Sequence, residues 1–163
     1  MEIDQLYNIY KQHPEICIDS RKINEGCLFF ALKGETFDGN QFASVALLSG
    51  AAYAIIDDPE KNKSDKCILV TSVLECLQEL ASYHRKHLNI PVLAITGSNG
   101  KTTTKELCRD VLQKKFNTKA TFGNLNNHIG VPLTILGTTS AVEFLIVEMG
   151  ANHQGEIDFL CKI

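Results

Sequence analysis

A short segment of small residues and one lysine contains the residue types best suited to chemistry in this chain. It reads "AITGSNGKTTTKE" (94–106) and contains, in order, Gly97, Ser98, Asn99, Gly100, Lys101, Thr102 and Thr103. The glycines let the backbone turn tightly and direct its N–H groups inward, and the N-terminus of a following helix adds partial positive charge. We therefore predict a cradle for a polyphosphate, in which Lys101 reaches the β- and γ-phosphates and the Thr102 hydroxyl coordinates Mg²⁺.

This segment is a variant of the usual phosphate-binding loop. The strict pattern G-x-x-x-x-G-K-[ST] would place a glycine at position 95, where this chain has Ile95, and the first glycine of the loop is Gly97 instead. An ordinary glycine-rich turn with a solvated lysine is the alternative interpretation. Phosphate binding is favoured because an apolar run precedes the loop and a helical pattern follows it.

An acidic residue follows a second apolar run. In "FLIVEMG" (144–150), Glu148 comes directly after four apolar residues. A carboxylate at the end of a buried strand lies at the carboxyl edge of a parallel sheet, which is also where a phosphate loop lies. Glu148 is therefore predicted to hold Mg²⁺ or a metal-bound water. Taken alone, such a glutamate would more ordinarily be a helix cap or a salt-bridge partner.

The second half of the chain alternates strand and helix patterns. Strands are expected at 91–96, 119–122 and 143–150, and helices at 103–116, at 131–136 with Pro132 in its first turn, and from 153 onward. This alternation predicts a parallel sheet with helices on its faces. The sequence stops inside the last of these helices. Because a nucleotide-binding α/β domain normally has several more strands, we expect the 163 residues to be part of a longer protein.

The first half reads as short strands and one helix, followed by a longer helix. Strands are expected at 15–20, 27–34, 51–58 and 66–70. The helix at 40–50 has Phe42, Val45 and Leu48 at helical spacing, and Gly50 is expected to end it. Ser72 and Glu75 form a capping-box pattern that begins the longer helix. That helix either carries the chain into a second domain or closes the first one.

The predicted fold class is therefore α/β. A small mixed α/β domain at 1–85 is followed by an incomplete parallel-sheet domain of the P-loop ATPase type at 86–163. Net charge is −3 with interspersed charges, so the basic surface of a nucleic-acid binder is not expected. No secretory signal and no apolar run long enough to span a membrane are evident, and the six scattered cysteines are expected to be reduced and mostly buried, as in a cytoplasmic protein.

Four segments together resemble the Mur ligase family, which builds the peptide stem of bacterial cell-wall precursors. They are "TGSNGKTTTKE" (96–106), "DSRKINEGCLFFALKGETFDGNQF" (19–42), "GNLNNHIGVPLTIL" (123–136) and "VEMGANHQGEI" (147–157). The last two are most similar to the member that joins D-alanyl-D-alanine to UDP-N-acetylmuramoyl-tripeptide. The resemblance covers most of the chain and implies ATP and Mg²⁺ as cofactors. We also expect a monomer.

The resemblance also implies roles for single residues. Ser20 and Arg21 would contact the UDP moiety, with Asp19 and residues 33–39 helping to shape the pocket. Asn126 and Asn127 would lie where the muramoyl end of the substrate meets the ATP γ-phosphate. Lys101, Thr102 and Thr103 would hold ATP and Mg²⁺, and Glu148 would be a Mg²⁺ ligand. His128 stands where the family often has an acid, so its role stays open, and His153 is either near the metal or a solvated residue at a helix start.

The implied reaction explains these residue types. A carboxylate is a poor acyl donor, and transfer of the γ-phosphoryl group converts it into an acyl phosphate that an amine can attack. Such a site mainly aligns and neutralises phosphate charge. In the family a downstream lysine assists a second Mg²⁺ and a third domain binds the dipeptide, so the 163 residues alone are expected to be inactive. A folylpolyglutamate synthase-like ligase, a fusion with alanine racemase, a non-enzymatic nucleotide-binding module and a degenerate loop are the alternatives.

Overall fold

The computed structural model describes all 163 residues, which form two compact units, Met1–Leu80 and Ala81–Ile163. Each unit contains its own parallel sheet, so the expected α/β class is confirmed. The boundary between the units falls inside helix α3 (Val73–Leu88). The domain division at 85/86 that the sequence indicates also falls in α3 and stays a prediction. No helix combines the length and the apolar character needed to cross a membrane.

The first unit is built on a four-stranded parallel sheet whose strands follow one another in chain order. The strands are β1 (Ile16–Cys17), β2 (Leu28–Phe30), β3 (Tyr53–Ile56) and β4 (Cys67–Leu69). Each predicted strand is present but shorter than its apolar run. Short 3₁₀ helices follow β1, precede α2 and follow β3; they are η1 (Ser20–Lys22), η2 (Gly39–Phe42) and η3 (Pro59–Lys61).

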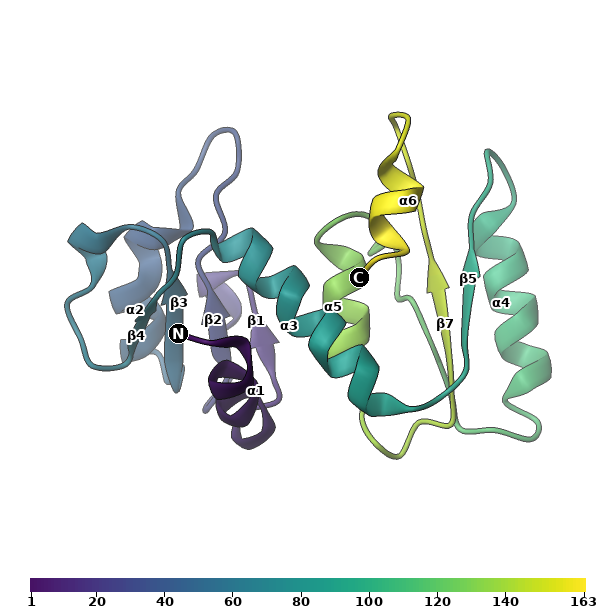
Figure 1. The fold of residues 1–163 in the computed structure, drawn as a ribbon, viewed down its shortest axis with the longest axis horizontal. Coiled ribbons are helices and arrows are strands. Elements are labelled where there is room, and N and C mark those ends of the chain that lie inside the picture. The colour runs from purple at the N-terminus through teal and green to yellow at the C-terminus, as the bar shows by residue number, and fades with distance from the viewer. The chain divides into compact units, whose positions relative to one another are not determined.

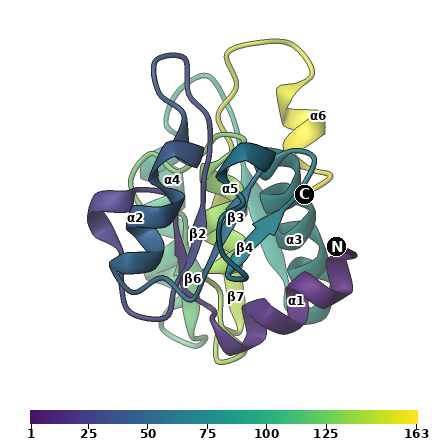
Figure 2. The same cartoon turned by 90° about the vertical axis from the view of Figure 1, so that its left-hand side faces the viewer.

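Helices cover both faces of this sheet. Helix α2 (Ala43–Leu48) lies on one face, and helix α1 (Ile3–Gln12) lies on the other together with the start of α3 (Figure 2). The sequence analysis did not predict helix α1. Its buried residues Leu6 and Tyr10 are four positions apart in the sequence and therefore lie on one face of the helix. The Ser72 hydroxyl accepts a hydrogen bond from the Glu75 N–H at 3.3 Å, as the capping-box pattern predicts.

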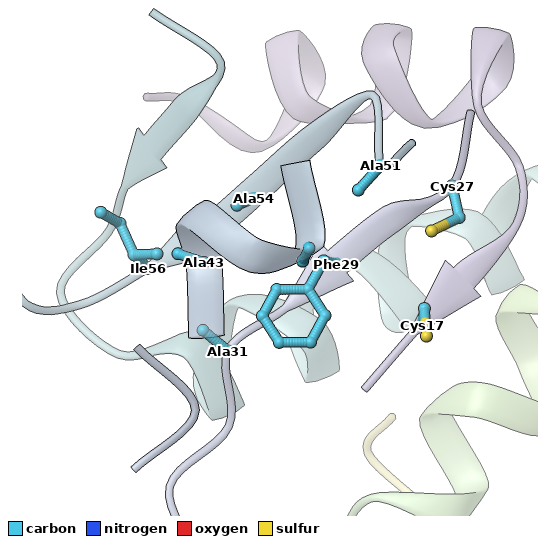
Figure 3. Close-up of a cluster of buried hydrophobic side chains, with 9 residues drawn as sticks. Cys17, Cys27, Phe29, Ala31, Ala43, Ala51, Ala54 and Ile56 are labelled. Atoms are coloured by element: carbon cyan, nitrogen blue, oxygen red, sulfur yellow. The ribbon is translucent and has the colours of Figure 1, made fainter. Parts of the chain in front are cut away.

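The core under α2 is made mostly of alanine and cysteine side chains. Phe29 and Ile56 pack there with cysteines and alanines, and the members of the cluster are Cys17, Cys27, Phe29, Ala31, Ala43, Ala46, Ala51, Ala54 and Ile56 (Figure 3). The prediction that Phe42, Val45 and Leu48 form the buried face of this helix was wrong, because their side chains are 42%, 51% and 89% exposed. Alanine brings the helix close to the sheet, and Leu47 packs partly against the same core, whereas the three side chains at the expected positions point outward.

The second unit has a three-stranded parallel sheet with its last strand in the middle. The order is β5 (Val92–Ile95), β7 (Phe144–Glu148) and β6 (Thr118–Ala120). Helix α4 (Lys101–Leu112) packs on one face and α5 (Gly130–Leu136) on the other, as Figure 1 shows. Pro132 lies in the first turn of α5, as expected.

The last helix and the cysteines depart from expectation. Helix α6 (Glu156–Leu160) begins three residues later than predicted, after Gly155, whose φ of +90° is in the left-handed region. All six cysteines are free thiols. Only Cys17, Cys27 and Cys76 are buried, so half of the cysteines, rather than most, lie in the interior.

Candidate functional site

The glycine-rich loop connects the end of β5 to the start of α4. Gly97 has φ +151° and Gly100, at the N-cap of α4, has φ +75°, and few residues other than glycine adopt these angles. A Cβ atom at Gly100 would meet nothing within 4 Å, so backbone conformation rather than space requires glycine there. The Lys101 ammonium donates to the Gly97 carbonyl at 2.7 Å and thus folds back over the loop. The geometry is that of an anion cradle at a helix N-terminus.

Glu148 lies at the carboxyl edge of the sheet from which this loop departs. It is the last residue of β7 and pairs with Ile95, the last residue of β5. Its side chain is 2% exposed. The Asn126 amide donates to Glu148 Oε1 at 2.9 Å, whereas Oε2 is buried without a hydrogen-bond partner. A buried carboxylate oxygen with an unused acceptor position is costly unless a cation or donor completes it.

A buried lysine beside Glu148 was not anticipated from the sequence. Lys105, one turn beyond Lys101 in α4, is 1% exposed, and its ammonium lies 3.8 Å from Glu148 Oε2. The same ammonium donates to the Thr121 carbonyl at 2.8 Å, and the Thr121 hydroxyl accepts from the Glu148 N–H at 2.9 Å. In the sequence, Lys105 resembles the surface lysines of an amphipathic helix, so neither its residue type nor its spacing indicates that it is buried.

The paired asparagines have different positions in the structure. Asn126 joins the Glu148 cluster, and a Cβ atom at Gly150 would come within 3.1 Å of the Asn126 side chain. Asn127 instead accepts hydrogen bonds from the Ile129 and Gly130 N–H groups at 3.1 and 2.8 Å, which fixes the start of α5. The structure therefore brings Asn126, but not the Asn127 side chain, to the carboxylate.

His128 and His153, to which the sequence analysis assigned no role, lie on the surface. His153 is 84% exposed at its side chain, and its Nδ1 lies 3.2 Å from Glu156 Oε1. Because Glu156 also accepts from the N–H groups of Asn152 and His153, this contact belongs to the start of α6. His128 is exposed, in the segment between β6 and α5.

In the first unit, Asp19, Ser20 and Arg21 form a tight turn after β1. Asp19 caps η1, accepting from the Arg21 N–H at 3.1 Å and from the Arg21 guanidinium at 2.8 Å through both carboxylate oxygens. These hydrogen bonds hold the pKa of the Asp19 carboxyl far below its usual range. The Arg21 side chain is 84% exposed, so its orientation is set while its outer face stays open to solvent.

The loop at 33–39 is anchored by two residues that the sequence did not single out. Asn40, 1% exposed, donates to Asp38 and Asp57 at 2.8 Å each and accepts from the Asp57 N–H at 3.0 Å. Lys33 pairs with Asp57 at 2.8 Å, and Asp57 also accepts from the first N–H of α3, that of Val73, at 3.2 Å. The loop base is therefore a fixed polar network, and a buried asparagine with both amide ends satisfied is its centre.

The second unit fits a nucleotide-bound Mg²⁺ better than a protein-caged metal. No group of three or more His, Cys, Asp or Glu side chains is placed to hold a metal ion. Mg²⁺ is usually bound through one or two carboxylates, with substrate phosphates and water completing its ligands. The unused Glu148 Oε2 supplies one such carboxylate oxygen, and the exposed Thr102 hydroxyl follows the loop at the first turn of α4.

Comparison with known proteins identifies both halves. The model "Mur ligase family, catalytic domain" matches residues 14–95, and "Mur ligase middle domain" matches residues 95–163. UDP-N-acetylmuramoyl-tripeptide–D-alanyl-D-alanine ligase of Bacillus subtilis (strain 168) is 41% identical over 150 residues, which are 91% of this chain and 33% of that protein. The ligase of the same name from Escherichia coli (strain K12) is 43% identical over 142 residues, 87% of this chain and 31% of that protein.

Solved structures agree with these matches. A crystal structure of MurF from Acinetobacter baumannii has a TM-score of 0.83 at 38% identity, covering 90% of this chain and 32% of that chain. MurF ligase from Thermotoga maritima in complex with ADP has the same TM-score and identity, covering 91% of this chain and 34% of that one. The chain thus spans about a third of the length of the relatives it matches. On these matches, the chain belongs to the Mur ligase family.

Proposed function

We propose that this chain provides the UDP-binding and nucleotide-binding parts of an ATP-dependent ligase that adds D-alanyl-D-alanine to UDP-N-acetylmuramoyl-tripeptide in peptidoglycan precursor synthesis. The observation that carries the proposal is the placement of the buried Glu148 carboxylate at the sheet edge from which the glycine-rich loop departs. The names of the relatives from Bacillus subtilis and Escherichia coli support the substrates, and the ADP complex of the Thermotoga maritima relative supports the nucleotide.

The second unit would bind ATP through its loop. Backbone N–H groups at the start of α4 would face the phosphates, and the Lys101 ammonium would leave the Gly97 carbonyl for a phosphate oxygen, a stronger, charge-assisted contact. Thr102 and Glu148 would hold Mg²⁺, and Thr103 would add a second hydroxyl near the phosphates. Bound there, Mg²⁺ would neutralise charge that develops on the transferring phosphoryl group.

Asn126 would orient both the carboxylate and the acyl substrate. Its amide donates to Glu148 Oε1 at 2.9 Å, which leaves its carbonyl oxygen free to accept. The substrate carboxylate would attack the γ-phosphorus of ATP, giving ADP and an acyl phosphate. The amine of D-alanyl-D-alanine would then attack the acyl carbon, and inorganic phosphate would leave with the bonding electron pair. Asn127, by fixing the start of α5, would hold the segment that carries Asn126.

The first unit would bind the UDP moiety through Ser20 and Arg21. Asp19 holds the Arg21 guanidinium by one edge, so its remaining N–H donors can contact a phosphate. The matched test is UDP binding by the complete protein. Arg21→Ala is expected to weaken UDP binding about tenfold or more, the loss of a charge-assisted hydrogen bond, whereas Lys22→Ala in the same turn should leave it nearly unchanged.

The deciding experiment is phosphate release from ATP by the complete protein, supplied with UDP-N-acetylmuramoyl-tripeptide, with and without D-alanyl-D-alanine. Release that requires both substrates would establish the ligase. Release with a folate acceptor instead would indicate a folylpolyglutamate synthase-like ligase, and nucleotide binding without release would indicate a non-enzymatic module. We further propose a monomeric, cytoplasmic protein, with the UDP-binding domain at 1–85 and the ATP-binding domain from 86, and expect no turnover from the 163 residues alone.

A further inference from the structure

Lys105 is the one lysine or arginine of the chain that is buried. It is 1% exposed, and its ammonium has three partners: the Thr121 carbonyl at 2.8 Å, Glu106 Oε1 at 3.1 Å and Glu148 Oε2 at 3.8 Å. The contact with Thr121 is a hydrogen bond, and the two carboxylate oxygens form ion pairs with the ammonium. The roles proposed above for the loop, for Mg²⁺ and for the substrates do not use it.

The contacts of Lys105 join three elements at one point. Lys105 belongs to α4, the helix that begins with the phosphate loop, whereas Thr121 follows β6 and Glu148 ends β7. Thr121 is held from both sides, because its carbonyl accepts from Lys105 at 2.8 Å and its hydroxyl accepts from the Glu148 N–H at 2.9 Å. The position of the carboxylate relative to the helix start is therefore set through two short hydrogen bonds.

The contact with Glu148 leaves the carboxylate available. At 3.8 Å the ammonium forms an ion pair with Oε2 but no hydrogen bond to it, and Oε1 is the oxygen that Asn126 occupies. Glu148 Oε2 thus keeps its acceptor positions, while the charge of Lys105 orients the carboxylate group. Burying both ions has a desolvation cost that an apolar pair of similar size would avoid, which argues for a role beyond packing.

We propose that Lys105 is a positioning residue, which holds the Glu148 carboxylate in register with the phosphate loop so that one Mg²⁺ contacts both the carboxylate and the nucleotide. This inference rests on the proposed binding of ATP and Mg²⁺ but not on the identity of the acyl substrate. Lys105 itself touches neither nucleotide nor metal. Partners of this kind, which orient a metal ligand from behind, change metal affinity about tenfold to a hundredfold when they are removed.

The test measures how strongly Mg²⁺ and nucleotide binding are coupled. In the complete protein, the dissociation constant of ADP is measured by calorimetry with and without Mg²⁺, and the ratio of the two values is the coupling. In Lys105→Met this ratio should fall about tenfold or more, while binding of metal-free ADP changes little. Leu136→Ala, a core truncation in α5 at a residue 1% exposed, is the matched control. It should lower stability and leave the ratio unchanged.

Each outcome decides the question. A folded Lys105→Met protein with the wild-type ratio would show that Lys105 only compensates a buried charge, and a higher ratio would show that it competes with Mg²⁺; both overturn the proposal. If Lys105→Met does not fold, Lys105→Gln replaces it, since the amide can still donate to the Thr121 carbonyl without the charge. If the unmodified protein shows coupling between Mg²⁺ and ADP, and Lys105→Met lowers it, but the unmodified protein does not use UDP-N-acetylmuramoyl-tripeptide, the proposed function is refuted and this inference stands.

Discussion

The buried pair of Lys105 and Glu148 allows a double-mutant test that needs neither nucleotide nor substrate. Lys105→Met leaves a carboxylate that is 2% exposed with Asn126 as its only side-chain donor, and should cost about 3–4 kcal/mol of unfolding free energy. Glu148→Gln should cost about 3 kcal/mol, the lower end of the range, because Lys105 keeps Glu106 at 3.1 Å. The double variant buries neither charge, so it should be less destabilised than the sum by about 2 kcal/mol.

Urea unfolding of the four proteins without Mg²⁺ measures this coupling. Hydrogen exchange at the β7 amides of Leu145 and Ile146 reports on the second unit alone, so unfolding of the first unit does not confuse the result. The matched control pairs Lys105→Met with Glu106→Gln. Because the Glu106 side chain is 38% exposed, that cycle should give less than about 1 kcal/mol. Additive costs in the Glu148 cycle, or equal coupling in both cycles, would refute the reasoning.

Three further predictions follow from single positions. Lys101→Ala should weaken ATP binding by the complete protein about tenfold or more, which isothermal titration measures. It should change the melting temperature little, because without phosphate the side chain bonds only a loop carbonyl, and thermal melts check this. Gly130→Ala would place a Cβ 2.3 Å from the Leu125 backbone and should cost about 3 kcal/mol in urea unfolding. Gly137→Ala would place a Cβ 2.8 Å from the end of the Lys119 side chain and 3.2 Å from the Leu133 carbonyl, and should cost clearly less. Burial lowers the pKa of His84 in the folded protein, so at pH values below the ordinary histidine pKa the unfolded chain binds more protons than the folded one. Stability should therefore fall as pH drops from 7 toward 5, and urea titrations across this range should show that His84→Asn lacks this part of the pH dependence.

The strands and the loop could be predicted because their signals are local. Apolar runs bounded by turn residues mark every strand except β6, whose Thr118–Ala120 has no such run, and the run ending in Glu148 predicts both a buried strand and a carboxylate at its end. The loop is marked by Gly97 and Gly100, both of which have positive φ in the structure. Backbone constraints of this kind act on the residue itself, so residue type alone reveals them.

The parts that could not be predicted depend on contacts between distant residues. The outward face of α2 is an example, because Phe42, Val45 and Leu48 have helical spacing, yet the residues of the helix that are buried against the sheet are Ala43 and Ala46. Helical spacing identifies a face but not the distance at which a sheet will pack against it.

Lys105 shows the same limit in the site. Its burial depends on Thr121 and Glu148, which lie 16 and 43 positions further along the chain. The residue type normally indicates the surface, since lysine is almost never fully buried unless it is paired. Asn40 and Asp57, which anchor the 33–39 loop across 17 positions, were missed for the same reason.

The strand orders of the two sheets imply different routes during synthesis on the ribosome. In the first sheet every new strand pairs with the one made just before it, so the sheet can grow step by step as the chain emerges. In the second, β5 and β6 pair only with β7, which is made last. No sheet can form there until Phe144–Glu148 has left the exit tunnel. The strand that completes the sheet also ends in Glu148, so the nascent chain gains its ordered sheet edge and its buried carboxylate in a single step.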